Sequence, residues 1–85
     1  MKPIRVRLFV KTFCGWCHEA KDWLEDHEIA YEEIDVNESA AGFAEMVKIS
    51  GQSFAPVIEV DGEFLADFDT EQLAEFWNDL DKNSE

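Results

Sequence analysis

The spacing of hydrophobic residues changes several times along the chain, and each change predicts a new element. Residues 4–10 place apolar side chains at alternating positions before a fully apolar end, a pattern typical of a buried strand. Over residues 15–27 the spacing becomes helical. The apolar stripe of this helix consists of Cys17, Ala20 and Leu24. Residues 31–36 alternate again among acidic side chains, which predicts a short strand at the edge of a sheet.

A second helix is predicted between two polar boundaries. Asn37 or Ser39 can serve as its N-cap, and Gly51 is the residue type that typically ends a helix. Four apolar residues repeat at helical spacing between these boundaries and predict the apolar face of the helix: Ala40, Phe43, Ala44 and Val47.

The last third of the chain predicts a hairpin followed by a helix. Residues 56–60 form an apolar strand, and Asp61-Gly62 is a strong signal for a two-residue turn into a strand over residues 63–65. The cap of the last helix is Asp69 or Thr70, with Gln72 as a capping-box partner of Asp69. Its apolar face consists of Leu73, Phe76, Trp77 and Leu80.

The predicted order is βαβαββα, which indicates an α/β protein with a mixed four-stranded sheet and helices on both faces. Eighty-five residues, 46% of them hydrophobic, suffice for one modest core. We therefore expect a single domain over residues 1–80 and a polar C-terminal tail over residues 81–85.

The charge of the chain is strongly negative and unevenly distributed. Twenty acids and seven bases give a formal net charge of −13, which argues against a nucleic-acid partner. Five of the bases but only one acid lie within residues 1–21, so positive charge gathers in the segment that contains Cys14. No apolar run is long enough to span a membrane, and the N-terminal residues do not resemble a signal peptide. We expect a cytoplasmic monomer.

Cys14-Gly15-Trp16-Cys17 lies where the first strand turns into the first helix. A helix N-terminus stabilises a thiolate through its free N–H groups and its dipole. Lys11, three residues earlier, either adds a cation to this site or is an ordinary solvated residue at the end of the strand. Cys14 is therefore predicted to attack a disulfide, and the less exposed Cys17 to resolve the mixed disulfide. Trp16 either forms an apolar wall of this site or simply packs within the helix.

Two segments resemble the glutaredoxin family. Residues 11–18, KTFCGWCH, resemble the glutaredoxin active site, with Gly15 in place of the usual proline. Residues 51–57, GQSFAPV, are similar to the family's Gly…Thr-Val-Pro segment. The resemblance covers nearly the whole chain and implies a thioredoxin-like fold. It also implies that Pro56 follows a cis bond facing the cysteines and presents the Ala55 backbone to a peptide or to glutathione.

The match is weaker in residues 66–70, ADFDT, where glutaredoxins carry two glycines before a polar-acidic pair. By resemblance, Phe68 and Asp69 belong to the binding site, and the Asp69 carboxylate meets the amino group of glutathione. Asp67 falls on a glycine position and adds negative charge near an anionic ligand. The resemblance implies reduction of protein disulfides or glutathione mixed disulfides, with glutathione as co-substrate and no tightly bound cofactor. The same residues are also similar to redoxins that thioredoxin reductase reduces and that serve ribonucleotide reductase.

A metal-binding role is the alternative from another class. Zinc takes four ligands, and beyond the two cysteines and His18 or His27 the chain offers none with suitable spacing, so we expect no mononuclear metal site. Some glutaredoxins with glycine or serine in place of the active-site proline bind a [2Fe–2S] cluster between two chains through the first cysteine and glutathione. That possibility stays open for the sequence alone.

Overall fold

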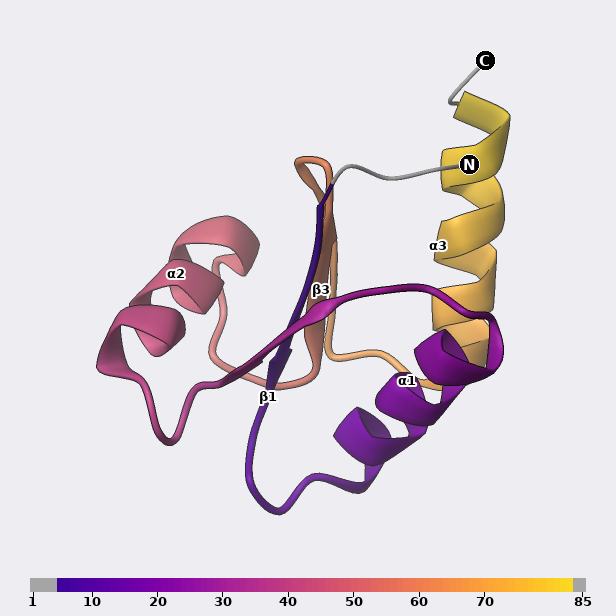
Figure 1. Cartoon of the computed structure of the whole chain (residues 1–85). Helices are drawn as coiled ribbons and strands as arrows, with labels where there is room; N and C mark the ends of the chain where they lie inside the picture. The colour runs from indigo at the N-terminus through magenta and orange to yellow at the C-terminus, as the bar shows by residue number, and fades with distance from the viewer. Residues whose placement is uncertain (1–4, 84–85) are drawn as a thin grey trace.

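Seven elements follow one another in the computed structural model, which describes residues 5–83 (Figure 1). They are β1 (Val6–Val10), α1 (Gly15–Asp26), β2 (Glu32–Asp35), α2 (Ala40–Ser50), β3 (Val57–Val60), β4 (Glu63–Ala66) and α3 (Thr70–Asn83). This order confirms the predicted α/β fold class. Ile4, expected in the first strand, lies outside the described residues.

The four strands form one mixed sheet in the order β2-β1-β3-β4. β1 runs parallel to β2 and antiparallel to β3, and β4 returns antiparallel to β3. β2 therefore lies at an edge, as its acidic residues predicted. Asp61 and Gly62 both have positive φ, 50° and 95°, which a tight two-residue hairpin requires.

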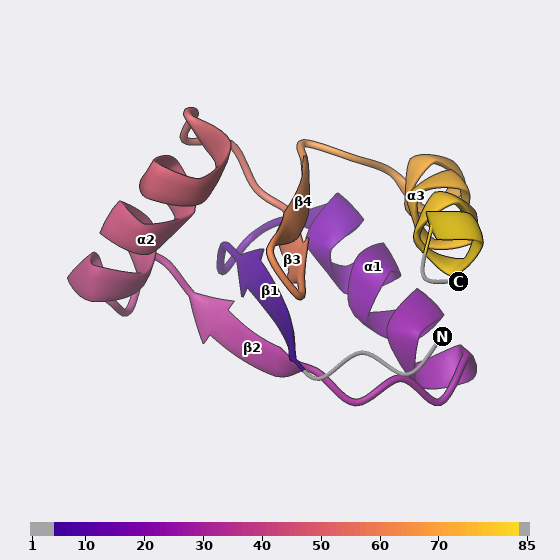
Figure 2. The ribbon, with the colours of Figure 1, turned by 90° about the horizontal axis from the view of Figure 1, so that it is seen from above.

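Helices cover both faces of the sheet. Figure 2 shows α2 on one side and α1 with α3 on the other. Alternate β1 residues divide between the two faces: Leu8 and Val10 join the core under α1 and α3, while Phe9 joins the core under α2. Cys17, Ala20 and Leu24 are the buried residues of α1, as predicted.

The predicted apolar face of α2 is wrong. Phe43 and Val47 are 38% and 36% exposed, whereas Gly42 and Met46 are buried. Ala40 and Ala44 of the predicted face are exposed as well. Gly42 explains the choice of face, because a Cβ there would lie only 2.6 Å from Cγ2 of Ile34. The missing side chain lets α2 approach β2 closely.

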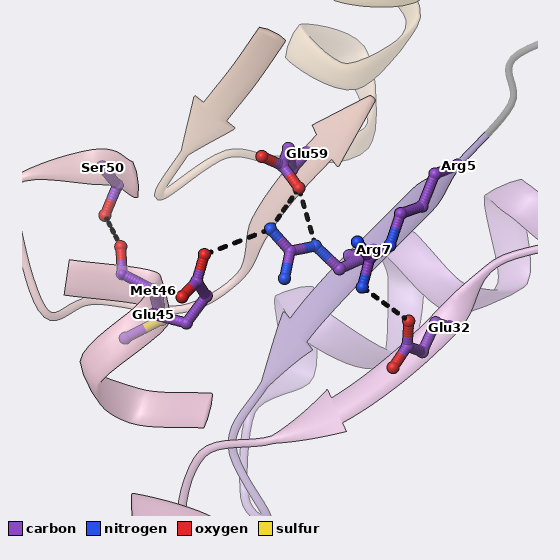
Figure 3. Close-up of polar contacts among 7 residues, drawn as sticks. All are labelled: Arg5, Arg7, Glu32, Glu45, Met46, Ser50 and Glu59. Carbon is purple, nitrogen blue, oxygen red and sulfur yellow. Dashed lines mark hydrogen bonds and ion pairs between the residues drawn. The ribbon is translucent and has the colours of Figure 1, made fainter. Parts of the chain in front are cut away.

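An ion-pair network under α2 also fixes this face (Figure 3). Arg7 on β1 lies opposite Glu59 on β3, and its Nε donates to Glu59 Oε1 at 2.6 Å. A terminal guanidinium nitrogen lies 3.4 Å from Oε1 of Glu45 on α2. The Arg7 side chain is only 12% exposed, so this network joins two strands and a helix in a partly desolvated place. Glu45 must face the sheet to take part.

The helix ends agree with the sequence, with one exception. Ser39 caps α2 by accepting from the Gly42 N–H, and Gly51 ends this helix in the left-handed conformation with φ 71°. α3 continues to Asn83, so the first three residues of the expected polar tail are helical. None of the helices within residues 5–83 is long and apolar enough to cross a bilayer.

Candidate active site

Three connections meet at one end of the sheet, at the bottom of Figure 1. Val57, the first residue of β3, lies opposite Phe9 near the end of β1 and opposite Ala66 at the end of β4. The chain leaving β1 toward Cys14, the chain entering β3 and the chain leaving β4 are therefore neighbours. A backbone hydrogen bond of 2.8 Å from Asp67 N to Pro56 O joins the last two.

Cys14 is the N-cap of α1. Its backbone is extended, with φ −142° and ψ 106°, and its Sγ accepts a hydrogen bond from the Cys17 N–H at 3.2 Å. The first turn of α1 contains no acidic residue. The dipole and this backbone donor therefore favour negative charge on Cys14 Sγ with no nearby carboxylate of the same helix opposing it.

Cys14 and Cys17 form a disulfide, with their Cα atoms 5.2 Å apart. Their surroundings differ. Cys17 is 2% exposed and belongs to the core under α1 and α3, whereas Cys14 is only partly buried at the border of that core. A partner molecule can thus reach Cys14 before it can reach Cys17.

The residues before β3 contain the cis bond that the resemblance implied. The Ala55–Pro56 peptide bond is cis. Pro56 is fully buried, while Ala55 is partly exposed at the same end of the sheet as the cysteines.

Comparison with known proteins agrees with this geometry. The sequence matches the Glutaredoxin family model over residues 6–65, which include every strand except the last residue of β4. The chain belongs to the glutaredoxin family. It is a thiol-disulfide oxidoreductase of that family, with Cys14 and Cys17 as its redox-active pair.

Individual relatives fall into two kinds. The chain is 31% identical to glutaredoxin 3 of Escherichia coli K12 over 64 residues, covering 75% of this chain and 77% of the relative. It is 38% identical to the glutaredoxin-like protein NrdH of Lactococcus lactis subsp. lactis over 69 residues, covering 81% and 94%. Among solved structures, the thioredoxin-like protein BC3987 superimposes with a TM-score of 0.78 at 28% identity, covering 84% of this chain and 97% of that protein.

The basic residues of this glutaredoxin do not gather at its cysteines as their positions in the sequence suggested. Arg5 pairs with Glu32 at 3.6 Å, and Lys21 pairs with Glu33 at 3.3 Å. Arg7 forms ion pairs with Glu59 and Glu45 on the face of the sheet under α2. Lys2 lies outside the described residues. Within the described chain, Lys11 has no ion-pair partner and directly follows β1 at the active-site end of the sheet.

The residues after β4 divide into buried and exposed positions. Phe68 is fully buried in the core under α1 and α3, so it packs the interior and does not form part of the surface at which the resemblance placed it. Asp69 and Gln72 form the predicted capping box: Gln72 N donates to Asp69 Oδ1 at 2.9 Å, and Asp69 N donates to Gln72 Oε1 at 3.0 Å. Asp67 is exposed and has a φ of 52°, a conformation that favours glycine.

A polar anchor of the active-site loop was not predicted from the sequence. Thr12 donates from Oγ1 to Asp35 Oδ2 at 3.3 Å and accepts from the side-chain amide of Asn37 at 3.2 Å. Asp35 also accepts from the Asn37 N–H at 2.8 Å. The loop that carries Cys14 is therefore tied to the chain leaving β2. Parallel pairing of β1 with β2 is the signal that could have suggested it, because the two strands end side by side.

Proposed function

We propose that this glutaredoxin acts as a cytoplasmic monomer that reduces protein disulfides and protein–glutathione mixed disulfides with electrons from glutathione. The observation that carries the dithiol chemistry is the asymmetry of the pair. Cys14 is only partly buried and its sulfur accepts a backbone hydrogen bond at the start of α1, whereas Cys17 is buried one turn further on.

The reaction is a two-electron exchange. The Cys14 thiolate attacks one sulfur of the substrate disulfide, the substrate S–S bond breaks, and the second substrate sulfur leaves as a thiolate that takes up a proton. Cys17 then loses its proton and attacks Cys14 Sγ, which releases the first substrate sulfur and forms the Cys14–Cys17 disulfide. Two molecules of glutathione return the protein to the dithiol and become glutathione disulfide.

Residues at the same end of the sheet support glutathione as the reductant. Lys11 offers an unpaired cation for a carboxylate of the tripeptide, and the second Asp69 carboxylate oxygen can receive its amino group while the first caps α3. Trp16, 49% exposed, and the partly exposed Ala55 complete the proposed binding surface, and the buried Pro56 and Phe68 support it from the core. Similarity to glutaredoxin 3 supports the same choice.

A coupled assay tests the electron donor. The oxidised protein is supplied in turn with glutathione, glutathione reductase and NADPH, and with thioredoxin reductase and NADPH, and NADPH consumption is followed with a disulfide substrate. We expect turnover in the first mixture. Turnover in the second mixture alone would overturn glutathione as the donor and leave the dithiol chemistry intact.

The second candidate is a redoxin that thioredoxin reductase reduces. The 38% identity to the Lactococcus lactis NrdH protein, over 94% of its length, favours it. So does Asp67, whose negative charge stands near the place proposed for an anionic ligand. Cluster binding between two chains through Cys14 and glutathione stays a prediction.

A further inference from the structure

Three large aromatic side chains are exposed around Cys14. Phe13 precedes Cys14 and is 98% exposed, Trp16 lies on the first turn of α1 and is 49% exposed, and Phe54 is 63% exposed. Phe54 stands two residues before Pro56, so it lies at the same end of the sheet as the cysteines. Aromatic side chains normally bury most of their surface, and a group of exposed ones marks a site of interaction.

The backbone of Phe54 is fixed by one side chain. Gln52 Oε1 accepts from the Phe54 N–H at 2.6 Å, and Gln52 Nε2 donates to the Phe54 carbonyl at 3.0 Å. Nε2 also donates to Ser50 Oγ at 3.0 Å. The Ser50 hydroxyl in turn donates to the Met46 carbonyl at 2.7 Å, which connects the loop to the last turn of α2 (Figure 3). Both polar backbone groups of Phe54 are thus satisfied internally, while its ring remains in solvent.

We propose that Phe54, held in place by Gln52, selects disulfides whose cysteine has an apolar neighbour in an extended segment of a partner protein. The inference rests on the proposed reduction of protein disulfides. A partner sulfur that reaches Cys14 brings its flanking residues to the end of the sheet where Phe13 and Phe54 are exposed, so the aromatic side chains are available to them. Glutathione has no apolar side chain and leaves the rings of Phe13 and Phe54 uncovered. These two rings therefore indicate a protein partner.

A single-turnover experiment tests the selectivity. The protein is reduced with dithiothreitol, desalted and mixed with the disulfide-linked dimer of a short neutral peptide that carries either Leu or Ser beside its cysteine. We expect the wild type to reduce the Leu peptide about tenfold faster, as partial burial of one aliphatic side chain allows. Phe54→Ser should remove most of this preference. Phe64→Ser, at the opposite end of β4 and 44% exposed in the wild type, is the matched control and should keep it.

Gln52 variants test the positioning role. Gln52→Ala should raise the half-saturating concentration of the Leu peptide severalfold, leave the saturated rate unchanged and leave the Ser peptide unaffected. Gln52→Glu keeps the acceptor for the Phe54 N–H and loses both Nε2 bonds, so its effect should be intermediate. A Gln52→Ala variant that slows both peptides equally would show that Gln52 only supports the fold, and would overturn its role in selection.

The outcomes separate this inference from the proposed function. Equal rates for the two peptides in the wild type overturn the selectivity, whatever the reductant. A clear preference for the Leu peptide together with no turnover on glutathione supports the selectivity and overturns the proposed electron donor.

Discussion

Cys14 and Cys17 carry the same chemical group in different surroundings, and this difference assigns their roles. Cys14→Ser should abolish all reductase activity, because no accessible nucleophile remains. Cys17→Ser should block resolution of protein mixed disulfides but keep removal of glutathione from glutathionylated substrates, since a second glutathione can resolve that intermediate. Assays with both substrate types check this. The roles would be reversed if Cys17 of the reduced protein were alkylated faster than Cys14 near neutral pH.

Asp67 combines an unfavourable backbone conformation with an unfavourable charge. Its φ of 52° costs an ordinary residue about 1 kcal/mol, and its carboxylate stands near the site proposed for glutathione. Asp67→Gly should therefore raise the free energy of unfolding by about 1 kcal/mol. It should also improve apparent affinity for glutathione by up to about fivefold at low ionic strength, and less at high salt. Urea unfolding and steady-state kinetics at two salt concentrations measure the two effects.

Asp67→Asn is the control that separates charge from backbone. Asparagine tolerates the left-handed conformation better than most residues and carries no charge. Asp67→Asn should therefore improve glutathione affinity as Asp67→Gly does, but should raise the free energy of unfolding much less than Asp67→Gly does. Unchanged affinity in both variants at both salt concentrations would remove Asp67 from the site.

At the scale of elements, a substitution at Gly15, the first residue of α1, can increase the free energy of unfolding. A Cβ at Gly15 would meet nothing within 4 Å, and Cys14 before it has the extended backbone that a following proline requires. Gly15→Pro should raise the free energy of unfolding by about 0.5–1 kcal/mol, chiefly by restricting the unfolded chain. Urea unfolding of the oxidised protein measures the change. A loss of stability in Gly15→Pro but not in Gly15→Ala would show that the Gly15 N–H is needed in the folded state.

Tyr31 ties α1 to the chain entering β2 by donating to Glu25 Oε2 at 2.8 Å. Burial, the bond to Glu25 and the charges of Glu33 and Asp22 raise the pKa of Tyr31 to about 12, from 10.0. The raised pKa means that this contribution to stability is complete below pH 10 and is lost as the pH rises toward 12. Tyr31 is the one tyrosine of the chain, so the near-ultraviolet absorbance of phenolate reports it directly.

The titration midpoint should lie near 12 in the folded protein and near 10 in urea. Tyr31→Phe should lower the free energy of unfolding by roughly 0.5–1.5 kcal/mol at neutral pH, and the pH dependence of stability above pH 10 should become smaller. A folded-state midpoint near 10 would contradict the bond to Glu25.

Local signals explain which elements could be predicted from the sequence. The Asp61-Gly62 turn, the Asp69–Gln72 capping box and the cysteine pair at the start of α1 depend on residues close together in the chain. The face of α2 could not be predicted, because Gly42 and Met46 form an apolar stripe that competes with the one through Phe43. Only contacts of this helix with Ile34 on β2 and with Arg7 on β1 decide between them.

Contacts between residues far apart in the sequence also limited the prediction of the active site and of the charge distribution. Pro56 and Cys14 were predicted from motifs, whereas the bonds of Thr12 to Asp35 and of Gln52 to Phe54 depend on side-chain rotamers within folded loops. The position of Arg7 in the sequence also suggested that its charge lies near the cysteines. In the structure Arg7 instead forms an ion pair with Glu59 on the face of the sheet under α2. A lone Arg and a lone Glu in two otherwise apolar strands were the signal for that pair.

For the whole molecule, a net charge of −13 opposes the attraction of anionic substrates by Lys11, the cation that residues 5–83 leave without an ion-pair partner at the active-site end of the sheet. The many acids act over a Debye length, about 10 Å at 0.1 M salt, whereas one lysine matters mainly at contact. Long-range repulsion should therefore dominate encounter rates at low salt. The reduced protein should react with glutathione disulfide faster as the salt concentration rises, and with a cationic peptide disulfide more slowly. Each rate should change by about tenfold or more between low salt and 1 M. Stopped-flow rates measure both. If glutathione disulfide instead slowed with added salt, Lys11 and the N-terminus of α1 would outweigh the acidic surface, and attraction at the site would control association.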